Sequence, residues 1–207
     1  TVNISANPVT GGDAAFDTFT DFENILVSAN ADSLKGDSAN NSIDGGAGDD
    51  TLFGGAGGDT LVGGAGSDTV DYSGSSVAVT VNIGGASSGG DADGDVLSLI
   101  ESVFGTSYND SLGGDASGNL LDGRDGNDTL QGGGGADTLI GGLGVDLVDY
   151  AASTTAVTID LGAGTGVGGD AQGDSFSGIE NIQGSANADV ITGNASANLI
   201  LGAAGND

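Results

Sequence analysis

The chain repeats a nine-residue, glycine-rich turn. Three consecutive copies read Gly45-Gly-Ala-Gly-Asp-Asp-Thr-Leu-Phe53, Gly54-Gly-Ala-Gly-Gly-Asp-Thr-Leu-Val62 and Gly63-Gly-Ala-Gly-Ser-Asp-Thr-Val-Asp71. Each copy has glycine at positions one, two and four, an acid at position six and a large aliphatic residue at position eight. Such a short, strict period is typical of solenoids, in which each repeat contacts only its neighbours. It favours an ordered array over a disordered glycine-rich segment, although Gly contributes 43 residues.

Position six of the turns carries an acidic or amide side chain throughout three arrays. The first array has Asp32, Asn41, Asp50, Asp59 and Asp68 at this position. The second array, from Gly105 to Tyr150, has Asp110, Asn119, Asp128, Asp137 and Asp146. The third array begins at Gly184 and has Asp189, Asn198 and Asp207. An array of regularly spaced oxygen ligands is therefore the strongest signal in the chain.

The charge balance points to divalent cations. The chain has 30 acidic residues against two basic ones and a formal net charge of −28, so a compact fold needs counter-ions. This charge excludes nucleic acid as a natural partner, because phosphates would be repelled. The chain has no His and no Cys, which makes zinc, iron and copper poor candidates. Carboxylate and carbonyl oxygens are the ligands that Ca²⁺ prefers, so we expect several calcium ions.

The turn has a physical logic that suits calcium. Glycines at positions one, two and four allow positive φ and a close approach of the backbone, so carbonyl oxygens can point at one centre. The acid at position six supplies a carboxylate. Because side chains alternate along a strand, position eight faces inward while positions seven and nine face outward. The inward residues are predicted to be Leu52, Leu61, Val70, Leu130, Leu139 and Val148.

On these nonapeptides the chain resembles the RTX (repeats-in-toxin) family of secreted bacterial proteins, over nearly its whole length. The resemblance implies an all-β fold, a right-handed parallel β-roll stabilised by calcium. Two nonapeptides make one coil, so residues 18 apart stack on the same edge. The resemblance further implies that each ion sits between two stacked turns and shares two Asp residues and several carbonyls.

The predicted metal ligands follow from that resemblance. The side-chain ligands are Asp50, Asp59, Asp68, Asp128, Asp137, Asp146, Asp32, Asn41, Asp110, Asn119, Asp189 and Asp207. The carbonyl ligands are Gly45, Ala47, Gly48, Gly54, Ala56, Gly57, Gly63, Ala65, Gly66, Gly123, Asp125, Gly126, Gly132, Gly134, Gly135, Gly141, Leu143 and Gly144.

The sites are not expected to be equivalent. The best should join complete turns, as Asp50 with Asp68 and Asp128 with Asp146. Pairs that contain Asn41 or Asn119 have one charge fewer and should bind more weakly. The turns of Asp32, Asp110 and Asp189 are poor in glycine, so we expect half-sites there.

A longer unit lies above the nonapeptide. Asn41, Asn119 and Asn198 lie 78 and 79 residues apart, and the connectors between arrays recur with them. We predict one continuous solenoid of three modules, at residues 1–72, 73–150 and 151–207, of which the first and third are partial. The chain begins and stops inside repeats, which indicates a piece of a longer protein.

The connectors carry acids of open meaning. Asp91, Asp95 and Glu101 recur as Asp170, Asp174 and Glu180, and as Asp13, Asp17 and Glu23. They either form a further calcium site or act structurally, with Asp shaping turns and Glu accepting hydrogen bonds from backbone amides; the structural role is slightly favoured. Tyr72 and Tyr150 end the arrays and are interpreted as caps on the core rather than platforms for a sugar.

Two functions remain open. The first is a calcium-folded structural or adhesive segment of a large extracellular bacterial protein, such as a stalk, surface layer, matrix or filament. The second is a stabilising, secretion-assisting region of an enzyme or toxin exported by type I secretion, with its catalytic domain elsewhere. Catalysis within these residues is disfavoured, because the usual nucleophile–base pairs need His or Cys and nearly every Asp falls at a repeated turn position. A carboxylate pair of the glycosidase kind is the catalytic option that stays open.

Localisation and partners follow from the same reasoning. We expect a secreted or cell-surface protein without membrane insertion. Besides calcium, candidate partners are identical modules or copies joined end to end, because a solenoid with open ends can polymerise head to tail. A cell-surface polysaccharide is a further candidate.

Overall fold

The computed structural model describes residues 2–3, 24–26 and 29–207. The connector copy with Asp13, Asp17 and Glu23 lies outside the described residues. The chain divides into two compact units, Thr1–Phe104 and Gly105–Asp207. This division does not test the three predicted modules, which stay a prediction.

The first unit contains two sheets of short strands. One sheet has the order β1 (Val2–Asn3), β3 (Ser33–Lys35), β5 (Thr51–Phe53), β7 (Thr69–Asp71) and β10 (Ser102–Phe104). The other has the order β2 (Asn24–Leu26), β4 (Ser42–Ala47), β6 (Thr60–Ala65) and β9 (Val96–Ser98). All pairings within these two sheets are parallel. Strand β8 (Thr80–Asn82) and the 3₁₀ helix η2 (Gly90–Ala92) lie in the connector.

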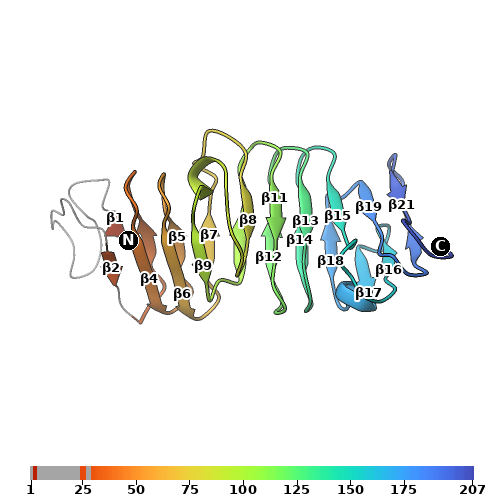
Figure 1. The fold of residues 1–207 in the computed structure, drawn as a ribbon, viewed down its shortest axis with the longest axis horizontal. Coiled ribbons are helices and arrows are strands. Elements are labelled where there is room, and N and C mark those ends of the chain that lie inside the picture. The colour runs from red at the N-terminus through yellow and green to blue at the C-terminus, as the bar shows by residue number, and fades with distance from the viewer. Residues whose placement is uncertain (1, 4–23, 27–28) are drawn as a thin grey trace. The chain divides into compact units, whose positions relative to one another are not determined.

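The second unit repeats this plan. One of its sheets contains β11 (Ser111–Gly113), β13 (Thr129–Gln131), β15 (Leu147–Asp149), β19 (Asn181–Gln183) and β21 (Ile200–Leu201). The other contains β12 (Leu120–Asp122), β14 (Thr138–Ile140), β18 (Ser175–Ser177), β17 (Thr165–Val167), β16 (Thr158–Asp160) and β20 (Val190–Thr192). The 3₁₀ helix η3 (Gly169–Ala171) corresponds to η2. Within each unit, Figure 1 shows the short strands stacked side by side with turns at their ends.

Strand register places residues 18 apart opposite one another. Leu34 pairs with Leu52 and Leu52 with Val70, while Leu112 pairs with Leu130 and Leu130 with Val148. Two nonapeptides therefore form one coil, as predicted. The predicted all-β, parallel β-roll is confirmed.

The core consists of columns of aliphatic side chains. All six predicted inward residues have no exposed surface: Leu52, Leu61, Val70, Leu130, Leu139 and Val148. The side chains at positions seven and nine of the same strands are partly exposed, as in the pattern of β5 and β7. This core is one residue deep per short strand, so burial of apolar surface alone contributes little per coil.

The connectors depart from a purely parallel roll. In the second unit, β17 pairs antiparallel with both β16 and β18. In the first, Thr80 and Ser88 form an antiparallel bridge. A local hairpin satisfies backbone groups where the glycine turns are missing. The antiparallel pairing was not predicted.

Candidate metal centre

A ladder of hydrogen bonds links stacked turns through the acid at position six. The amide of Asp50 donates to Asp68 Oδ1 at 2.8 Å, and the amide of Asp32 donates to Asp50 Oδ1 at 2.7 Å. In the second unit, the amide of Asp128 donates to Asp146 Oδ1 at 2.8 Å. The remaining rungs join Asn41 to Asp59, Asp110 to Asp128, Asn119 to Asp137 and Asp189 to Asp207. Thus the predicted stacked pairs are in direct contact.

The second carboxylate oxygen of six acids has no hydrogen-bond partner. These oxygens are Oδ2 of Asp50, Asp59, Asp68, Asp128, Asp137 and Asp146. The side chains are at most 1% exposed. A buried charge without a partner is costly, so a folded state with these oxygens ionised requires a cation. Four of these acids, Asp50, Asp68, Asp128 and Asp146, belong to the pairs of complete turns that were predicted to be the best sites.

Glycine at position one makes room for that oxygen. A Cβ on Gly45 would stand 2.5 Å from Asp50 Oδ2 and 2.6 Å from the carbonyl oxygen of Gly63, on the next coil. Any larger residue would fill the space on which the two oxygens converge. The φ angle of Gly45 is not positive, so this glycine is required by close approach alone.

Positions two and four need glycine for a different reason. In the same turn Gly46 and Gly48 have φ of 82° and 118°. Arg124 occupies position two of the Asp128 turn and still adopts φ of 74°, although it has a Cβ. Left-handed backbone at position two therefore accompanies the unpartnered oxygen even where glycine is absent.

Five degenerate turns have a different structure, which we call closed. In each, the backbone amide at position two donates to the side-chain oxygen at position six. The donor–acceptor pairs are Asp37 to Asn41, Thr106 to Asp110, Asp115 to Asn119, Ser185 to Asp189 and Asn194 to Asn198, at 2.6–2.9 Å. The hydroxyls of Thr106 and Ser185 also donate to the other carboxylate oxygen of Asp110 and Asp189. In these five turns, protein groups donate hydrogen bonds to the side chain at position six. We call the six turns with an unpartnered Oδ2 open.

Some predicted carbonyl ligands have protein partners of their own. The carbonyl of Ala65 accepts from the amide of Gly48 at 2.9 Å, and that of Leu143 accepts from Gly126 at 2.9 Å. By contrast, the carbonyl oxygen of Gly63 and Asp50 Oδ2 converge on the space beside Gly45, which we call the cradle of that turn. The assignment of all predicted side-chain and carbonyl ligands stays a prediction.

Burial raises the pKa of several acids in the open turns. It raises the pKa of Asp128 to about 7 and the pKa of Asp59 and Asp137 to about 6, against an ordinary value of 3.8. The pKa values of Asp68 and Asp146 are also raised by burial. Desolvation disfavours the charged form, and backbone hydrogen bonds to Oδ1 offset it only partly.

The connector acids continue each series of hydrogen bonds by accepting the backbone amide of an acid in the array. Asp59 and Asp137 donate their amides to Oδ1 of Asp95 and Asp174, at 2.8 and 2.9 Å. Asp68 donates its amide to Glu101 Oε2 at 2.8 Å. The expected role of glutamate as an acceptor for backbone amides is therefore present in the structure. Asp91 and Asp170 lie in the 3₁₀ helices η2 and η3.

Two buried tyrosines donate hydrogen bonds to the connector aspartates. Tyr72 and Tyr150 are each 2% exposed, which fits their interpretation as caps. The Tyr72 hydroxyl donates to Asp95 Oδ2 at 2.8 Å, and the Tyr150 hydroxyl donates to Asp174 Oδ2. This contact was missed from the sequence. The recurrence of both residues in both connectors was the only available signal.

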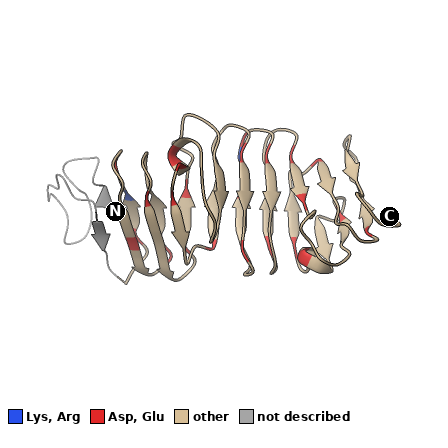
Figure 2. Ribbon diagram, viewed as in Figure 1, with Lys and Arg blue, Asp and Glu red and all other residues tan. Residues whose placement is uncertain are grey.

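The donor set fits calcium. No group of three or more acidic side chains able to hold a metal ion occurs in the described part of the chain. An ion at an open turn would therefore take a carboxylate oxygen together with backbone carbonyls. Hard oxygen ligands of this mixed kind are typical of Ca²⁺. Figure 2 shows many acidic residues where strands meet turns.

Comparison with known proteins agrees with the geometry. The model of the RTX calcium-binding nonapeptide repeat matches four times, at residues 28–61, 35–70, 113–148 and 174–207. No curated protein gave a significant match. No helix among the described residues is long and apolar enough to cross a membrane. Since the repeat matches cover more than half of its length, the chain belongs to the RTX family of calcium-binding nonapeptide repeat proteins.

Proposed function

We propose that this chain is a calcium-folded structural or adhesive repeat segment of a large extracellular bacterial protein. The observation that carries the proposal is the set of six buried carboxylate oxygens without hydrogen-bond partners, in two arrays of the same design. When they are ionised, side chains of this kind are compatible with folding only if a cation is supplied. Nearly every Asp falls at a repeated turn position, which supports a structural rather than a catalytic role.

Calcium supplies two positive charges, which offset the repulsion between carboxylates. The chain's own residues position the turns and the ligand oxygens. Oδ1 of each acid fixes the spacing of the coils, Oδ2 is held in a cradle beside glycine, and the aliphatic columns exclude water from one side. Without calcium the net charge of −28 favours an expanded chain.

We infer that binding and folding are coupled, as in other small metal-dependent domains. Extracellular calcium-binding modules have Kd values of roughly 10⁻⁴ to 10⁻³ M. We therefore expect the chain to fold when calcium reaches these concentrations. Such a chain would stay unfolded in a calcium-poor cytosol and fold after export. The family resemblance makes type I secretion the proposed route.

The structural role is tested by assembly. Sedimentation velocity and light scattering are measured across a range of protein concentrations, with calcium or with a chelator. Assembly that grows with protein concentration in calcium, and is absent in chelator, supports a stalk, layer or filament. A chain that folds with calcium yet stays monomeric at every concentration contradicts self-assembly and favours the stabilising region of a secreted enzyme or toxin.

A further inference from the structure

In each unit, a short segment at the end of the connector stacks on the last turn of the array and reproduces the next turn in a shortened form. In the first unit this segment is Leu99-Ile-Glu101, and in the second unit it is Gly178-Ile-Glu180. Glu101 Oε2 accepts the amide of Asp68 at 2.8 Å, and Glu180 Oε2 accepts the amide of Asp146 at 3.0 Å. Within an array, the aspartate 18 residues later has this role. Each glutamate thus replaces the aspartate of the next turn.

The carbonyl ligand is replaced as well. A Cβ on Gly63 would stand 2.7 Å from Asp68 Oδ2 and in contact with the carbonyl oxygen of Leu99. In the second unit, a Cβ on Gly141 would stand 2.6 Å from Asp146 Oδ2 and in contact with the carbonyl oxygen of Gly178. The same convergence occurs inside the array, where the Gly45 cradle holds Asp50 Oδ2 and the Gly63 carbonyl. One arrangement of a carboxylate and a carbonyl therefore continues past the last turn.

The aspartate that faces each segment is buried and lacks a partner. Asp68 and Asp146 have no exposed surface, and Oδ2 of each has no hydrogen-bond donor. Leu99 and Gly178, which supply the carbonyls, share a left-handed backbone with φ of 54° and 64°. Because two segments of different sequence share this backbone conformation and this arrangement of oxygens, the arrangement is a conserved part of the repeat design within the chain and not a local accident.

The other edge of each roll ends differently. There Asp95 follows Asp59, but Oδ1 of Asp95 accepts the Asp59 amide and Oδ2 accepts the Tyr72 hydroxyl. Asp174 has the corresponding two partners in the second unit. On this edge a tyrosine hydroxyl therefore donates to the second oxygen of the connector aspartate. On the edge with Glu101 and Glu180, by contrast, an unpartnered carboxylate oxygen and a backbone carbonyl oxygen converge beside a glycine.

We propose that each complete array ends in an additional calcium site formed by Asp68, the Leu99 carbonyl and Glu101, and by Asp146, the Gly178 carbonyl and Glu180. This proposal rests on calcium binding by the open turns. It assigns the connector glutamates a role as ligands besides their hydrogen bonds to backbone amides. These sites close the stacks of ions where the glycine turns stop.

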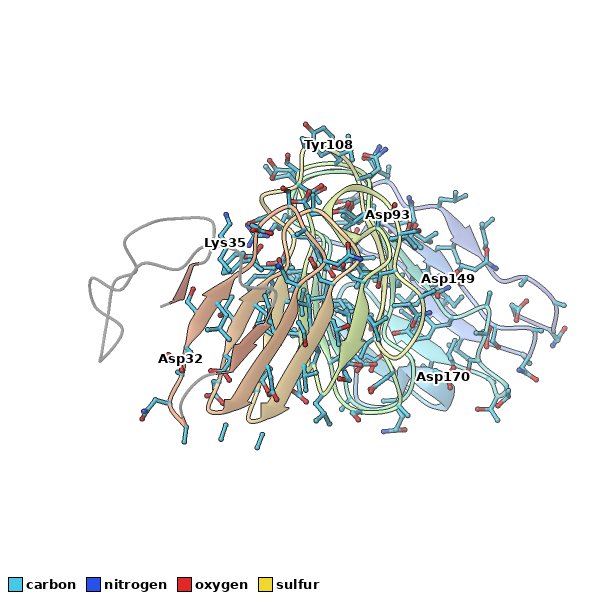
Figure 3. All side chains as sticks on the ribbon, turned by 60° about the vertical axis from the view of Figure 1, so that its left-hand side comes forward. Asp32, Lys35, Asp93, Tyr108, Asp149 and Asp170 are labelled. Carbon is cyan, nitrogen blue, oxygen red and sulfur yellow. The ribbon has the colours of Figure 1, made fainter. Side chains whose placement is uncertain are left out.

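The test counts bound calcium on the full chain by equilibrium dialysis with radioactive calcium. The variants are Glu101→Gln, Glu180→Gln and the double substitution, because glutamine keeps an oxygen that can accept the amide hydrogen bond. The matched control is Asp93→Asn, which removes one charge from an exposed acid of the same connector, labelled in Figure 3. Circular dichroism at saturating calcium verifies that each variant is folded.

The proposal predicts one ion fewer for each single variant, two fewer for the double variant, and no change for Asp93→Asn. An unchanged ion count in a folded double variant overturns it while leaving calcium-dependent folding intact. A wild-type chain that binds no calcium would instead remove the proposed function itself. Should a variant fail to fold, calcium anomalous scattering from crystals of the wild-type chain decides: density beside the Leu99 and Gly178 carbonyls supports the sites, and its absence there refutes them.

Discussion

Open and closed turns differ in the backbone conformation at position two and satisfy the residue at position six in different ways. At the Asp137 turn, a left-handed Gly133 accompanies an Oδ2 without a partner. At the Asn119 turn, two nonapeptides and therefore one coil earlier, Asp115 donates its amide to the side chain at 2.8 Å. The difference teaches that a left-handed backbone at position two, together with glycine at position four, distinguishes turns that leave an oxygen for a cation from turns that close on themselves.

The largest effect is expected from removing all six open-turn charges. Changing Asp50, Asp59, Asp68, Asp128, Asp137 and Asp146 to Asn should abolish the dependence of the far-UV β signal on calcium, because neutral amides leave no buried charge for the ion to compensate. The control changes the closed-turn acids Asp110 and Asp189 to Asn and should keep the calcium response. Equal loss in both variants would show that the two kinds of turn do not differ.

The cradle at position one is tested by Gly132→Ala. The added Cβ would collide with Asp137 Oδ2, so the free energy of unfolding in calcium should fall by about 3 kcal/mol, the upper end for overpacking. Gly74→Ala is the control, because a Cβ there meets nothing within 4 Å. Denaturant unfolding measures both variants. A loss no larger than that of the control would mean that the cradle is not needed.

A closed turn should be convertible into an open one. Asp115→Gly, Ser117→Gly and Asn119→Asp together restore glycine at positions two and four and the acid at position six. The triple variant should bind one more calcium ion than wild type in equilibrium dialysis. Asn119→Asp alone is the control and should add no ion, because Asp115 still donates its amide. An unchanged count in the triple variant would refute the role of position two.

Protons should substitute for calcium in part. Since the folded-state pKa values of Asp128, Asp59 and Asp137 are raised above 3.8, to about 7, 6 and 6, the metal-free fold binds more protons than the unfolded chain. Its stability is therefore greatest at low pH and is lost as pH rises towards 7. In chelator, circular dichroism should show more β structure at pH 5 than at pH 8. A loss of β signal on acidification would contradict this sign.

Much of the fold could be predicted because it is local and periodic. The inward position of Leu52 and the pairing of residues 18 apart follow from strand alternation and a strict nine-residue repeat. The connectors could not be predicted in the same way. The contact between Tyr72 and Asp95 joins residues 23 apart in sequence, and no local pattern specifies it.

The site was predictable to a similar extent. The six turns with an unpartnered oxygen include the four for which the best sites were predicted, those of Asp50, Asp68, Asp128 and Asp146. Sequence reasoning grouped the glycines at positions one, two and four, whereas the structure separates close approach at Gly45 from positive φ at Gly46. Arg124 shows why composition alone is insufficient, because it adopts the glycine conformation within an open turn.

The most direct test of the central claim is a far-UV circular dichroism titration of calcium into chelator-treated wild-type chain, with magnesium as the control. Buried, unpartnered carboxylates predict a cooperative gain of β signal with calcium that magnesium does not reproduce, because magnesium dehydrates reluctantly and demands octahedral geometry. A β-rich spectrum that is already complete in chelator at neutral pH would contradict the account.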